Sequence, residues 1–257
     1  MVEAERFVEG AARQLSVPVA DLLHAPGGRR ERQVVTGACL SVFEERDGWS
    51  FVRAEADGYV GYIQSNLLES AQEATHIVNA RATHLYPEAD FKAHELESLS
   101  MGARLNVLSV GPRFAETDKG FVPKAHLRAL DDTEHDPVTV AERLIGTPYL
   151  WGGNSAFGID CSGLVQMGLL ACGLACPGDS DMQEAALGED LGNRAPRRGD
   201  LYFWKGHVAF VADEETLLHA NVHHMAVAHE GLEEAVNRIA EQGDGPVTAR
   251  KRLELTK

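Results

Sequence analysis

Short apolar runs broken by Gly, Pro and Asp fill the first half of the chain, from about Asp21 to Leu130. Runs of this length between such breakers are typical of the short strands of an all-β fold. We expect strands in the segments CLSVFEE, WSFVRAE, YVGYIQ, RLNVLSV and GFVP. The Pro- and Gly-rich segment SVPVADLLHAPGGRRERQ is expected to form the entry to the first of these strands.

A weak repeat lies within this half. The segment GYIQSNLL at Gly61–Leu68 resembles GFVPKAHL at Gly120–Leu127, since both place an aromatic residue after Gly and a Leu at the end. Turn signals accompany both copies, at Ala56–Gly58 and at Asp118–Gly120. Two copies can arise by coincidence, but the natural interpretation is that two similar small barrels stand in tandem.

The second half reads differently, as a mixture of helices and strands. An acidic stretch that ends in Pro, Asp131–Pro137, has the character of a linker. Beyond it, PVTVAERLIG, Leu164–Leu174 and LEEAVNRIAE are expected to be helices, and DLYFW, HVAFVAD and TLLHAN read as strands. This order predicts an α+β domain. We therefore divide the chain into residues 1–70, 71–132 and 133–257, which are an N-terminal segment with a first barrel, a second barrel, and the α+β domain.

Composition narrows the range of partners and locations. The chain has 257 residues and a formal net charge of −15 at pH 7. Nucleic acids and anionic membranes attract clustered Lys and Arg, so neither is an expected partner. No stretch resembles a secretory signal or is apolar enough to span a bilayer. The four cysteines are too sparse for a disulfide framework. Reduced thiols and a cytoplasmic location are therefore expected, although the sequence does not show whether a leader has been removed. No obligate protein partner is evident.

The first candidate for chemistry is Cys161, which lies between the Gly-rich segment WGGNSAFGID and a predicted helix. Asp160 is a natural N-cap residue at that junction. The helix dipole and the unpaired N–H groups of a helix start favour a thiolate. The same N–H groups can stabilise an oxyanion that forms on a bound carbonyl group. This position therefore predicts a nucleophile with part of an oxyanion hole.

A nucleophilic thiol needs a base, and two histidines downstream are candidates. His207 opens one predicted strand, and His219 lies on the next. Adjacent antiparallel strands can place the two side by side, so that His207 takes the thiol proton and His219 fixes the tautomer of His207. A lone Cys near a helix start is usually a packed core residue, and a lone His on a strand is usually structural. The combination, in this order and context, is far more specific.

These residues carry a resemblance to a known family. TPYLWGGNSAFGIDCSGLVQ, RRGDLYFWKGHVAFV and LLHAN resemble the three signature segments of the NlpC/P60 cysteine peptidases, and the likeness runs from Val138 to the C-terminus. That family has a papain-like α+β fold and a Cys–His–His triad. The resemblance therefore implies Cys161 as nucleophile, His207 as base and His219 as the orienting residue.

The same segments imply further site residues. Tyr149 matches a family tyrosine whose hydroxyl group lies near the nucleophile, where it can assist the oxyanion site. Asp160 and Ser162, on either side of the nucleophile, are implied to be substrate-binding residues. No metal and no organic cofactor is implied.

The chain further resembles the subgroup that carries two bacterial SH3-like (SH3b) domains ahead of the catalytic domain, the γ-D-glutamyl-L-diamino acid peptidases. In that subgroup an R-D-[SA]-x-x-Q segment follows the nucleophile helix, and its Asp binds the free amine of an N-terminal L-Ala. Here the segment reads GDSDMQ, so Asp179, Ser180 and Gln183 match, while Gly178 replaces the usual Arg. The resemblance implies that Asp179 and Ser180 bind substrate, in a loop that the Arg no longer holds.

The first SH3b domain of the subgroup adds a Glu and a Tyr to the same pocket. GYVGY matches the Tyr segment, which implies that Tyr59 binds substrate. The segment RQVVTGACLSV aligns with one that normally reads Gly-Glu, but here Ala38 follows Gly37. We therefore expect a preference for peptides with a free N-terminal amine that is weaker than in relatives that keep the Glu.

Other candidates have simpler interpretations. Cys172 and Cys176 are four residues apart, which puts them on one helix face, where core packing is a better explanation than a zinc site. His223 and His224 are adjacent and would point to opposite faces of a strand, where polar roles on the surface or near the site are a better explanation than metal ligation. Trp151 in the Gly-rich segment can line a cleft or pack, and we expect it to pack.

The sequence as a whole predicts a papain-like α+β catalytic domain behind two small all-β SH3-like barrels. The expected activity is cleavage of the γ-D-glutamyl–diamino acid bond in murein peptides with a free N-terminal L-Ala, through the Cys–His–His triad. Recycling of wall fragments inside the cell suits this substrate. The alternative is a scaffold without catalytic activity that binds cell-wall peptides through its SH3b modules.

Overall fold

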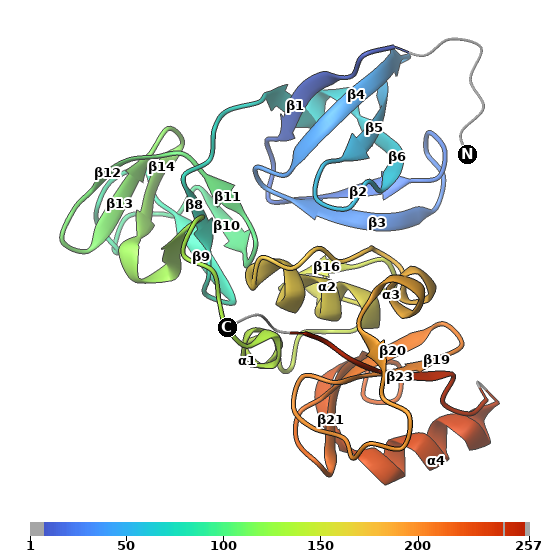
Figure 1. Ribbon diagram of the computed structural model, residues 1–257. Helices are drawn as coiled ribbons and strands as arrows, with labels where there is room; N and C mark the ends of the chain where they lie inside the picture. Colours follow the sequence, from blue (N-terminus) through green and yellow to red (C-terminus); the bar gives the residue numbers. More distant parts are fainter. Residues whose placement is uncertain (1–7, 244, 255–257) are drawn as a thin grey trace.

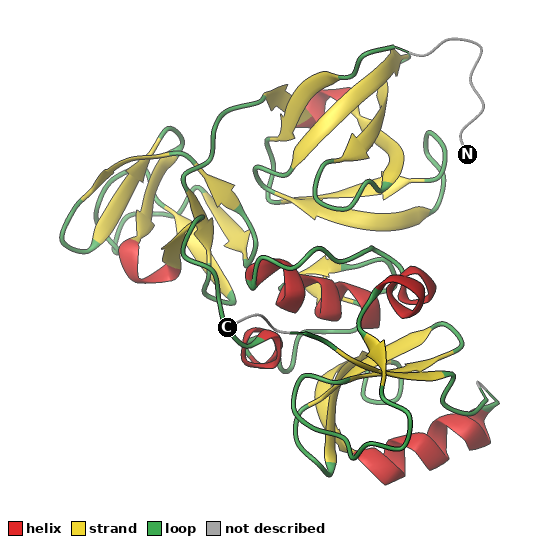
Figure 2. Ribbon diagram, viewed as in Figure 1, coloured by secondary structure: helices red, strands yellow, loops and turns green. Residues whose placement is uncertain are grey.

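The computed structural model describes residues 8–243 and 245–254, which form three parts (Figure 1). Two parts consist of strands with short 3₁₀ turns, and the third contains α1 to α4 together with a sheet (Figure 2). We call them the first β part (residues 8–70), the second β part (residues 71–132) and the α+β part (residues 133–254). Helix α2 of the α+β part lies next to the first β part, directly below it in Figure 1.

The first β part is one antiparallel sheet of seven strands in the order β3-β2-β6-β5-β4-β1-β7. Its side chains enclose a core that includes Leu22, Val34, Val52 and Ile63. Its elements are β1 (Ala11–Leu15), β2 (Val19–Leu23), β3 (Arg30–Val35), β4 (Cys39–Arg46), β5 (Trp49–Ala54), β6 (Val60–Gln64), the 3₁₀ turn η1 (Ser65–Leu67) and β7 (Leu68–Ser70).

The Pro- and Gly-rich segment at residues 16–33 differs from the expectation that it forms an entry to the first strand. It belongs to the sheet, as the paired strands β2 and β3, and is not an entry to it. Burial alternates along β2, where Ala20 and Leu22 point inward. Of the breakers that suggested an irregular segment, Pro18 lies just before β2, and Pro26, Gly27 and Gly28 form the turn between the two strands, where Gly27 has a φ of +65°.

The second β part has shorter strands in three small sheets, ordered β10-β9, β11-β8-β15 and β12-β13-β14. The repeat seen in the sequence has a structural counterpart, because β6, η1 and β7 follow one another as β14, η2 and β15 do. The elements are β8 (His76–Val78), β9 (Ala82–Leu85), β10 (Glu97–Ser100), β11 (Arg104–Leu105), β12 (Val107–Val110), β13 (Phe114–Thr117), β14 (Gly120–Pro123), η2 (Lys124–His126) and β15 (Leu127–Ala129).

The α+β part is built on an antiparallel sheet of six strands in the order β18-β23-β19-β20-β21-β22. The predicted strands DLYFW, HVAFVAD and TLLHAN are its β19, β20 and β21. The elements are α1 (Pro137–Glu142), β16 (Asn154–Ser155), β17 (Gly158–Ile159), α2 (Cys161–Ala171), α3 (Ser180–Ala186), β18 (Glu189–Asp190), β19 (Leu201–Trp204), β20 (His207–Val211), β21 (Thr216–Asn221), β22 (Ala226–Gly231), α4 (Leu232–Gln242) and β23 (Ala249–Arg252).

Strand β19 shows why this sheet is apolar on both faces. Leu201 and Phe203 join the core that the sheet shares with α1 and α2. Tyr202 and Trp204 point the other way, into a second core that contains residues of α4. Because helices cover both faces, the strand is fully buried and does not alternate between apolar and polar residues.

Helix α2 begins at Cys161, three residues before the predicted start, and ends at Ala171. The chain leaves the helix at Gly173, whose φ of +75° suits glycine. Cys172 therefore caps the helix and Cys176 lies beyond it, so the expectation that they share a helix face is wrong. Cys176 is buried and Cys172 is partly exposed, and all four cysteines of the chain are free.

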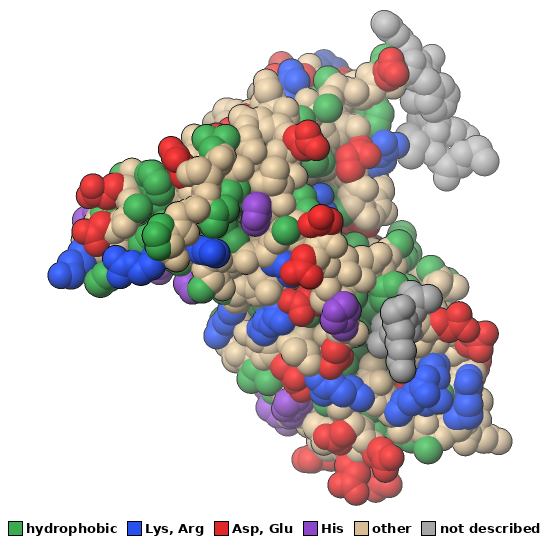
Figure 3. All heavy atoms as spheres, turned by 60° about the vertical axis from the view of Figure 1, so that its left-hand side comes forward, with side chains coloured by type: hydrophobic (Ala, Val, Ile, Leu, Met, Phe, Trp, Pro, Cys, Tyr) green, Lys and Arg blue, Asp and Glu red, His purple; other side chains and the backbone are tan. Residues whose placement is uncertain are grey.

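Surface charge is mixed on the face that Figure 3 shows, where Lys and Arg side chains lie interspersed with Asp and Glu. Within residues 8–243 and 245–254, no helix combines the length and the apolar character that crossing a bilayer requires.

Candidate active site

The start of α2 is fixed by Asp160, which is buried. Its Oδ1 accepts hydrogen bonds from the N–H of Gly163 (2.7 Å) and the hydroxyl of Ser162 (3.1 Å), and its Oδ2 accepts from the N–H of Gly152 (2.9 Å). A Cβ on Gly163 of α2 would lie 2.7 Å from the carbonyl oxygen of Gly153, so the Gly-rich segment packs closely against the first turn of the helix. Asp160 is therefore the N-cap that the sequence predicts, with its carboxylate already largely occupied by protein donors.

Cys161 is the first residue of α2 and is only 6% exposed. Its Sγ lies 4.0 Å from the carbonyl oxygen of Gly206, just before β20. The backbone N–H of Val208 also lies against the sulfur, together with the N–H groups of Ser162 and of Cys161 itself. The thiol therefore sits against the main chain on both sides of His207.

The protonation state of this thiol differs from the prediction. Burial raises the pKa of Cys161 to about 12, and the negative charge of Asp160 acts in the same direction. The N–H of Val208 on β20 lowers the pKa, as do the N–H groups of Ser162 and Cys161 at the helix start, but burial outweighs them. Without substrate the residue is therefore a neutral thiol, and the expectation of a thiolate favoured by the helix start is wrong for the free protein.

A chain of hydrogen bonds begins at His207, whose sequence neighbours Gly206 and Val208 contact the thiol. Nε2 of His207 lies 2.9 Å from Nδ1 of His219, and Nε2 of His219 lies 2.9 Å from Oε2 of Glu230. Arg238 on α4 donates to both oxygens of Glu230, from Nε at 2.7 Å and from Nη2 at 2.8 Å. The two histidines are thus side by side on β20 and β21, as their strands predict, and two further residues support them.

The charge of Glu230 determines where the protons of this chain lie. Burial raises the pKa of Glu230, but the hydrogen bonds from His219 and Arg238 outweigh it and hold the pKa well below its usual range. An ionised carboxylate only accepts, so Nε2 of His219 carries the proton of that hydrogen bond. Burial lowers the pKa of His219 and keeps its ring neutral, so its Nδ1 must accept from Nε2 of His207.

His207 is left as a neutral base. Burial lowers its pKa to about 3, with a smaller contribution from His219. Since Nε2 carries the proton, the lone pair is on Nδ1, the ring nitrogen nearest the main chain of His207. The thiol of Cys161 lies against that same main chain. The arrangement can therefore move a proton from a thiol to an imidazole whose tautomer is already set.

Glu230 and Arg238 were not found from the sequence. Glu230 is 7% exposed and lies near the end of β22, which pairs with the strand of His219. Its signal in the sequence was weak, a carboxylate just before the predicted C-terminal helix. Arg238 lies eight positions further on, within the predicted C-terminal helix. The apolar pattern of that helix did not indicate that the Arg238 side chain bonds with Glu230 on β22.

Tyr149 lies beside the thiol, with its backbone N–H bonded to the carbonyl of Met225 (2.9 Å). Burial raises the pKa of its hydroxyl group well above the usual range, and the neighbouring acidic groups of Cys161 and Asp160 act in the same direction. The hydroxyl group therefore keeps its proton and can donate to an oxygen atom near Cys161.

A second group of predicted residues gathers where the first β part meets the α+β part. Asp179 occupies the N-cap position of α3 but makes no capping hydrogen bond, and it bonds instead with Tyr59. Burial raises the pKa of Asp179, against the opposing effects of Arg32 and the Tyr59 hydroxyl. Burial also raises the pKa of Tyr59 to about 12, and the charges of Asp179 and Glu31 raise it further by smaller amounts. Glu31 was not among the predicted site residues.

The loop that carries Asp179 is tied to the nucleophile helix. Nε2 of the buried Gln183 donates to the carbonyl oxygens of Ser162 (2.9 Å) and Pro177 (2.9 Å). Ser180 follows Asp179 as the first residue of α3 and is partly exposed. Predicted residues from three segments, around 59, 161 and 179, are thereby brought to one region.

Three other predicted candidates lie elsewhere or behave differently. His223 and His224 are in the turn between β21 and β22 and not on a strand, with their rings 4.8 Å apart. The side chain of Trp151 does not pack as expected, since the residue is 54% exposed. Among residues 8–243 and 245–254, no three His, Cys, Asp or Glu side chains are grouped so as to hold a metal ion.

Comparison with known families agrees with this geometry. Residues 146–239 match the NlpC/P60 family, and residues 22–68 match the bacterial dipeptidyl-peptidase Sh3 domain. The α+β part therefore contains a papain-like NlpC/P60 peptidase domain, and the first β part contains a bacterial SH3 domain. The resemblance to NlpC/P60 peptidases that carry a bacterial SH3 domain is confirmed.

Individual relatives narrow the comparison. Dipeptidyl-peptidase 6 of Lysinibacillus sphaericus is 28% identical over 236 residues, which cover 82% of this chain and 84% of the relative. The gamma-D-glutamyl-L-lysine dipeptidyl-peptidase of Bacillus subtilis (strain 168) is 29% identical over 194 residues, or 68% of this chain and 64% of the relative. A crystal structure of an NlpC/P60 family protein from Bacillus cereus has a TM-score of 0.81 at 20% identity, with 96% of this chain and all of that chain covered. This last likeness concerns the fold.

Proposed function

We propose that the chain hydrolyses the γ-D-glutamyl–diamino acid bond of murein peptides that have a free N-terminal L-Ala. The observation that carries the proposal is the hydrogen-bonded chain from Glu230 through His219 to His207, whose neighbours Gly206 and Val208 contact the Cys161 thiol. The choice of bond is supported by relatives that bear the name gamma-D-glutamyl-L-lysine dipeptidyl-peptidase.

The reaction would proceed in two steps. Nδ1 of His207 takes the thiol proton as Sγ of Cys161 attacks the γ-glutamyl carbonyl carbon. The C–N bond breaks, the proton passes from His207 to the leaving amine, and the peptide is left as a thioester on Cys161. His207 then deprotonates a water molecule, which releases L-Ala-γ-D-Glu and restores the thiol. The N–H groups at the start of α2 and the hydroxyl of Tyr149 would stabilise the oxyanion.

The N-terminal amine would be bound where the two parts meet. Asp179 and Tyr59 are the residues expected from the resemblance, with Ser180, Ser162 and Asp160 around them. Ala38, which stands where a Glu is usual, packs against the core of the first β part. The charge of Glu31 contributes to raising the pKa of Tyr59, and its carboxylate, which pairs with Arg29 at 2.8 Å, is proposed as the second carboxylate of the pocket. The preference for a free amine is then not weakened by Ala38.

Two further assignments belong to this proposal. The second β part is a second SH3-like barrel, because its strands and 3₁₀ turn follow the order found in the first. The domains are residues 1–70, 71–132 and 133–257, and the enzyme acts on wall fragments in the cytoplasm. The alternative of a scaffold without activity is disfavoured by the complete set of Cys161, His207 and His219.

Replacing Glu230 with Gln tests the supporting role of this carboxylate. The amide can turn its NH₂ toward His219, which reverses both tautomers and leaves a proton on Nδ1 of His207. We expect kcat to fall by about 10- to 100-fold with KM nearly unchanged, and Glu230→Asp to recover part of the loss. Glu142→Gln, which removes a carboxylate from an ion pair with Arg198 on the surface, is the matched control. Full activity in Glu230→Gln would show that His219 needs no such partner.

Selection of the free amine is tested with two peptides that differ only at the N-terminus. A charge-assisted contact contributes about 1.5–3 kcal/mol, so kcat/KM for L-Ala-γ-D-Glu-L-Lys should exceed that for the N-acetylated peptide by about 10- to 100-fold. Asp179→Asn should reduce this ratio, and so should Glu31→Gln. Equal rates on both peptides in the native chain would contradict the amine pocket.

A further inference from the structure

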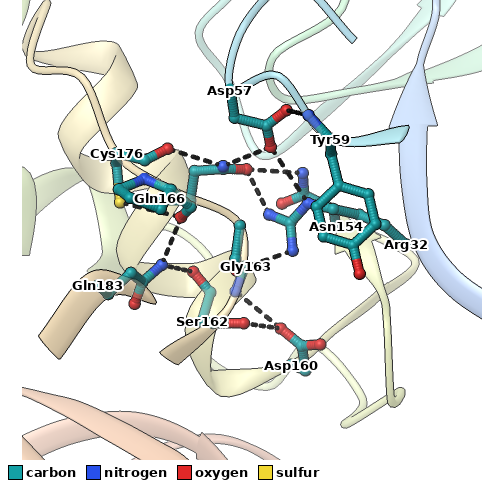
Figure 4. A network of polar contacts seen from close by, with 12 residues as sticks. Arg32, Asp57, Tyr59, Asn154, Asp160, Ser162, Gly163, Gln166, Cys176 and Gln183 are labelled. Carbon is teal, nitrogen blue, oxygen red and sulfur yellow. Dashed lines mark hydrogen bonds and ion pairs between the residues drawn. The ribbon is translucent and has the colours of Figure 1, made fainter. Parts of the chain in front are cut away.

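Arg32 on β3 is a buried arginine, 2% exposed, to which the proposed function assigns no part. It comes from the first β part, yet its side chain reaches the α+β part (Figure 4). A buried guanidinium group is costly unless its charge is paired and its N–H groups are bonded, so its partners indicate what it holds in place.

The partners of Arg32 lie on both sides of the boundary between the two parts. Its Nη1 donates to the carbonyl oxygen of Gly178 at 3.0 Å, and its Nη2 donates to Oε1 of Gln166 on α2. Its Nε lies 3.6 Å from Oδ2 of Asp57 in the first β part. The guanidinium carbon lies 5.7 Å from the ring centre of Tyr59, within the range of a cation–π contact.

Gln166 completes this set of contacts. Its Nε2 donates to Oδ2 of Asp57 (2.8 Å) and to the carbonyl of Cys176 (3.0 Å), while its Oε1 also accepts from Asn154 (3.2 Å). Figure 4 shows these side chains grouped between the first β part and the start of α2. The loop from Cys176 to Gly178, which leads directly into Asp179, is thus bonded at both ends to a cluster centred on Arg32.

Gly178 shows how closely this loop is packed. A Cβ at this position would lie 2.8 Å from Cδ2 of Tyr59 and 3.3 Å from Nε of Arg32. The sequence lacks an arginine at position 178, where the resembling subgroup carries one. Here a guanidinium group reaches the same loop from the other side of the boundary.

Arg32 also sets the charge around the proposed substrate-binding carboxylates. Burial is the main cause that raises the pKa of Asp160 and of Asp179, and Arg32 is the first of the effects that oppose it in both. The residue therefore favours the ionised form of Asp179, the form that can pair with an ammonium group.

We propose that Arg32 is a positioning residue for substrate selection, through which the first β part holds the Asp179 loop against Tyr59 and so determines the preference for a free N-terminal amine. This inference rests on the proposed function, because it concerns the same pocket. On this inference the SH3 domain acts on the specificity site through one defined contact, from Arg32 to the loop that carries Asp179.

The test measures the ratio of kcat/KM for the free and the N-acetylated tripeptide in Arg32→Met and Arg32→Lys. Arg32→Met should lower the ratio by about tenfold or more, mainly through a higher KM for the free peptide, while the acetylated peptide changes little. Lys keeps the charge but cannot bond Gly178 and Gln166 together, so Arg32→Lys should lower the ratio by about threefold.

Arg143→Met is the matched control. Arg143 also joins two parts, since it donates to the carbonyl of Asn79 (3.3 Å) in the second β part, but it lies outside the pocket. The Arg143→Met variant should leave the ratio of kcat/KM for the two peptides unchanged. If Arg32 were merely structural, its loss would slow both peptides equally, and an unchanged ratio in Arg32→Met would overturn the inference. If that variant does not fold, an unchanged ratio in Arg32→Lys overturns it. A native chain that cleaves both peptides equally, or neither, contradicts the proposed function instead.

Discussion

Replacing Cys161 with Ala is expected to lower kcat/KM on L-Ala-γ-D-Glu-L-Lys by about four to six orders of magnitude. The thioester cannot form without Sγ, and the residues described offer no second thiol at this place. Cys172 lies at the other end of α2, Cys176 follows in the loop beyond it, and Cys39 belongs to the first β part. Cys161→Ser should be nearly as inactive, because an alcohol is a weaker nucleophile than a thiol with the same base. Peptide hydrolysis followed by chromatography measures both variants.

The fold should survive these substitutions. Both replace one small buried side chain, and Asp160 continues to cap α2 through the N–H of Gly163. Thermal unfolding and circular dichroism check this. Cys172→Ser, at the other end of α2, is the matched control and should keep full activity. If Cys161→Ala kept substantial activity on the peptide, the nucleophile proposed above would be wrong.

Replacing His207 with Ala is the second large effect, a loss of about three to five orders of magnitude in kcat. Burial holds the pKa of Cys161 near 12, so the thiol gives up its proton only if a base receives it during the attack. His207 has the lone pair for this, and His219 is already bonded to Glu230. His219→Ala should cost less, and His219→Asn or Gln should retain more activity, since an amide can still orient the imidazole.

The pH dependence gives an independent check on the same base. The pKa of His207 is lowered to about 3, so the ring stays an unprotonated base as the pH falls through 6.5. The base is lost by protonation only well below pH 6.5. The acid limb of kcat/KM should therefore lie below about pH 5. The acetylated peptide is the substrate to use, because it takes Asp179 out of the profile. His229→Ala, a histidine on the neighbouring strand β22 that pairs with Glu142, should leave rate and profile unchanged. A limb near pH 6.5 would contradict the assignment.

The parts of the site that lie close together in the sequence were predictable. The Gly-rich segment, the N-cap Asp160 and the first residue of a helix lie within a dozen positions, so their relation to Cys161 follows from local rules. His207 and His219 open and occupy successive strands, and their contact follows from antiparallel pairing.

The rest depends on contacts between distant segments. Arg32 meets Gly178 across 146 positions and Gln166 across 134, and no local pattern encodes such pairs. The same holds for the reach of Arg238 from α4 to Glu230. The protonation of Cys161 was wrongly predicted because the helix start can be read from the sequence, whereas the burial that outweighs it comes from the packing of α2 against β20.

The products of a defined peptide test the central claim most directly. L-Ala-γ-D-Glu-L-Lys, or the same peptide with diaminopimelate, would be incubated with the native chain and with Cys161→Ala, and the products identified by mass spectrometry. The account predicts the dipeptide L-Ala-γ-D-Glu and the free diamino acid from the native chain, and uncleaved peptide from the variant. Release of free L-Ala, an intact peptide with the native chain, or the same products from Cys161→Ala would contradict it.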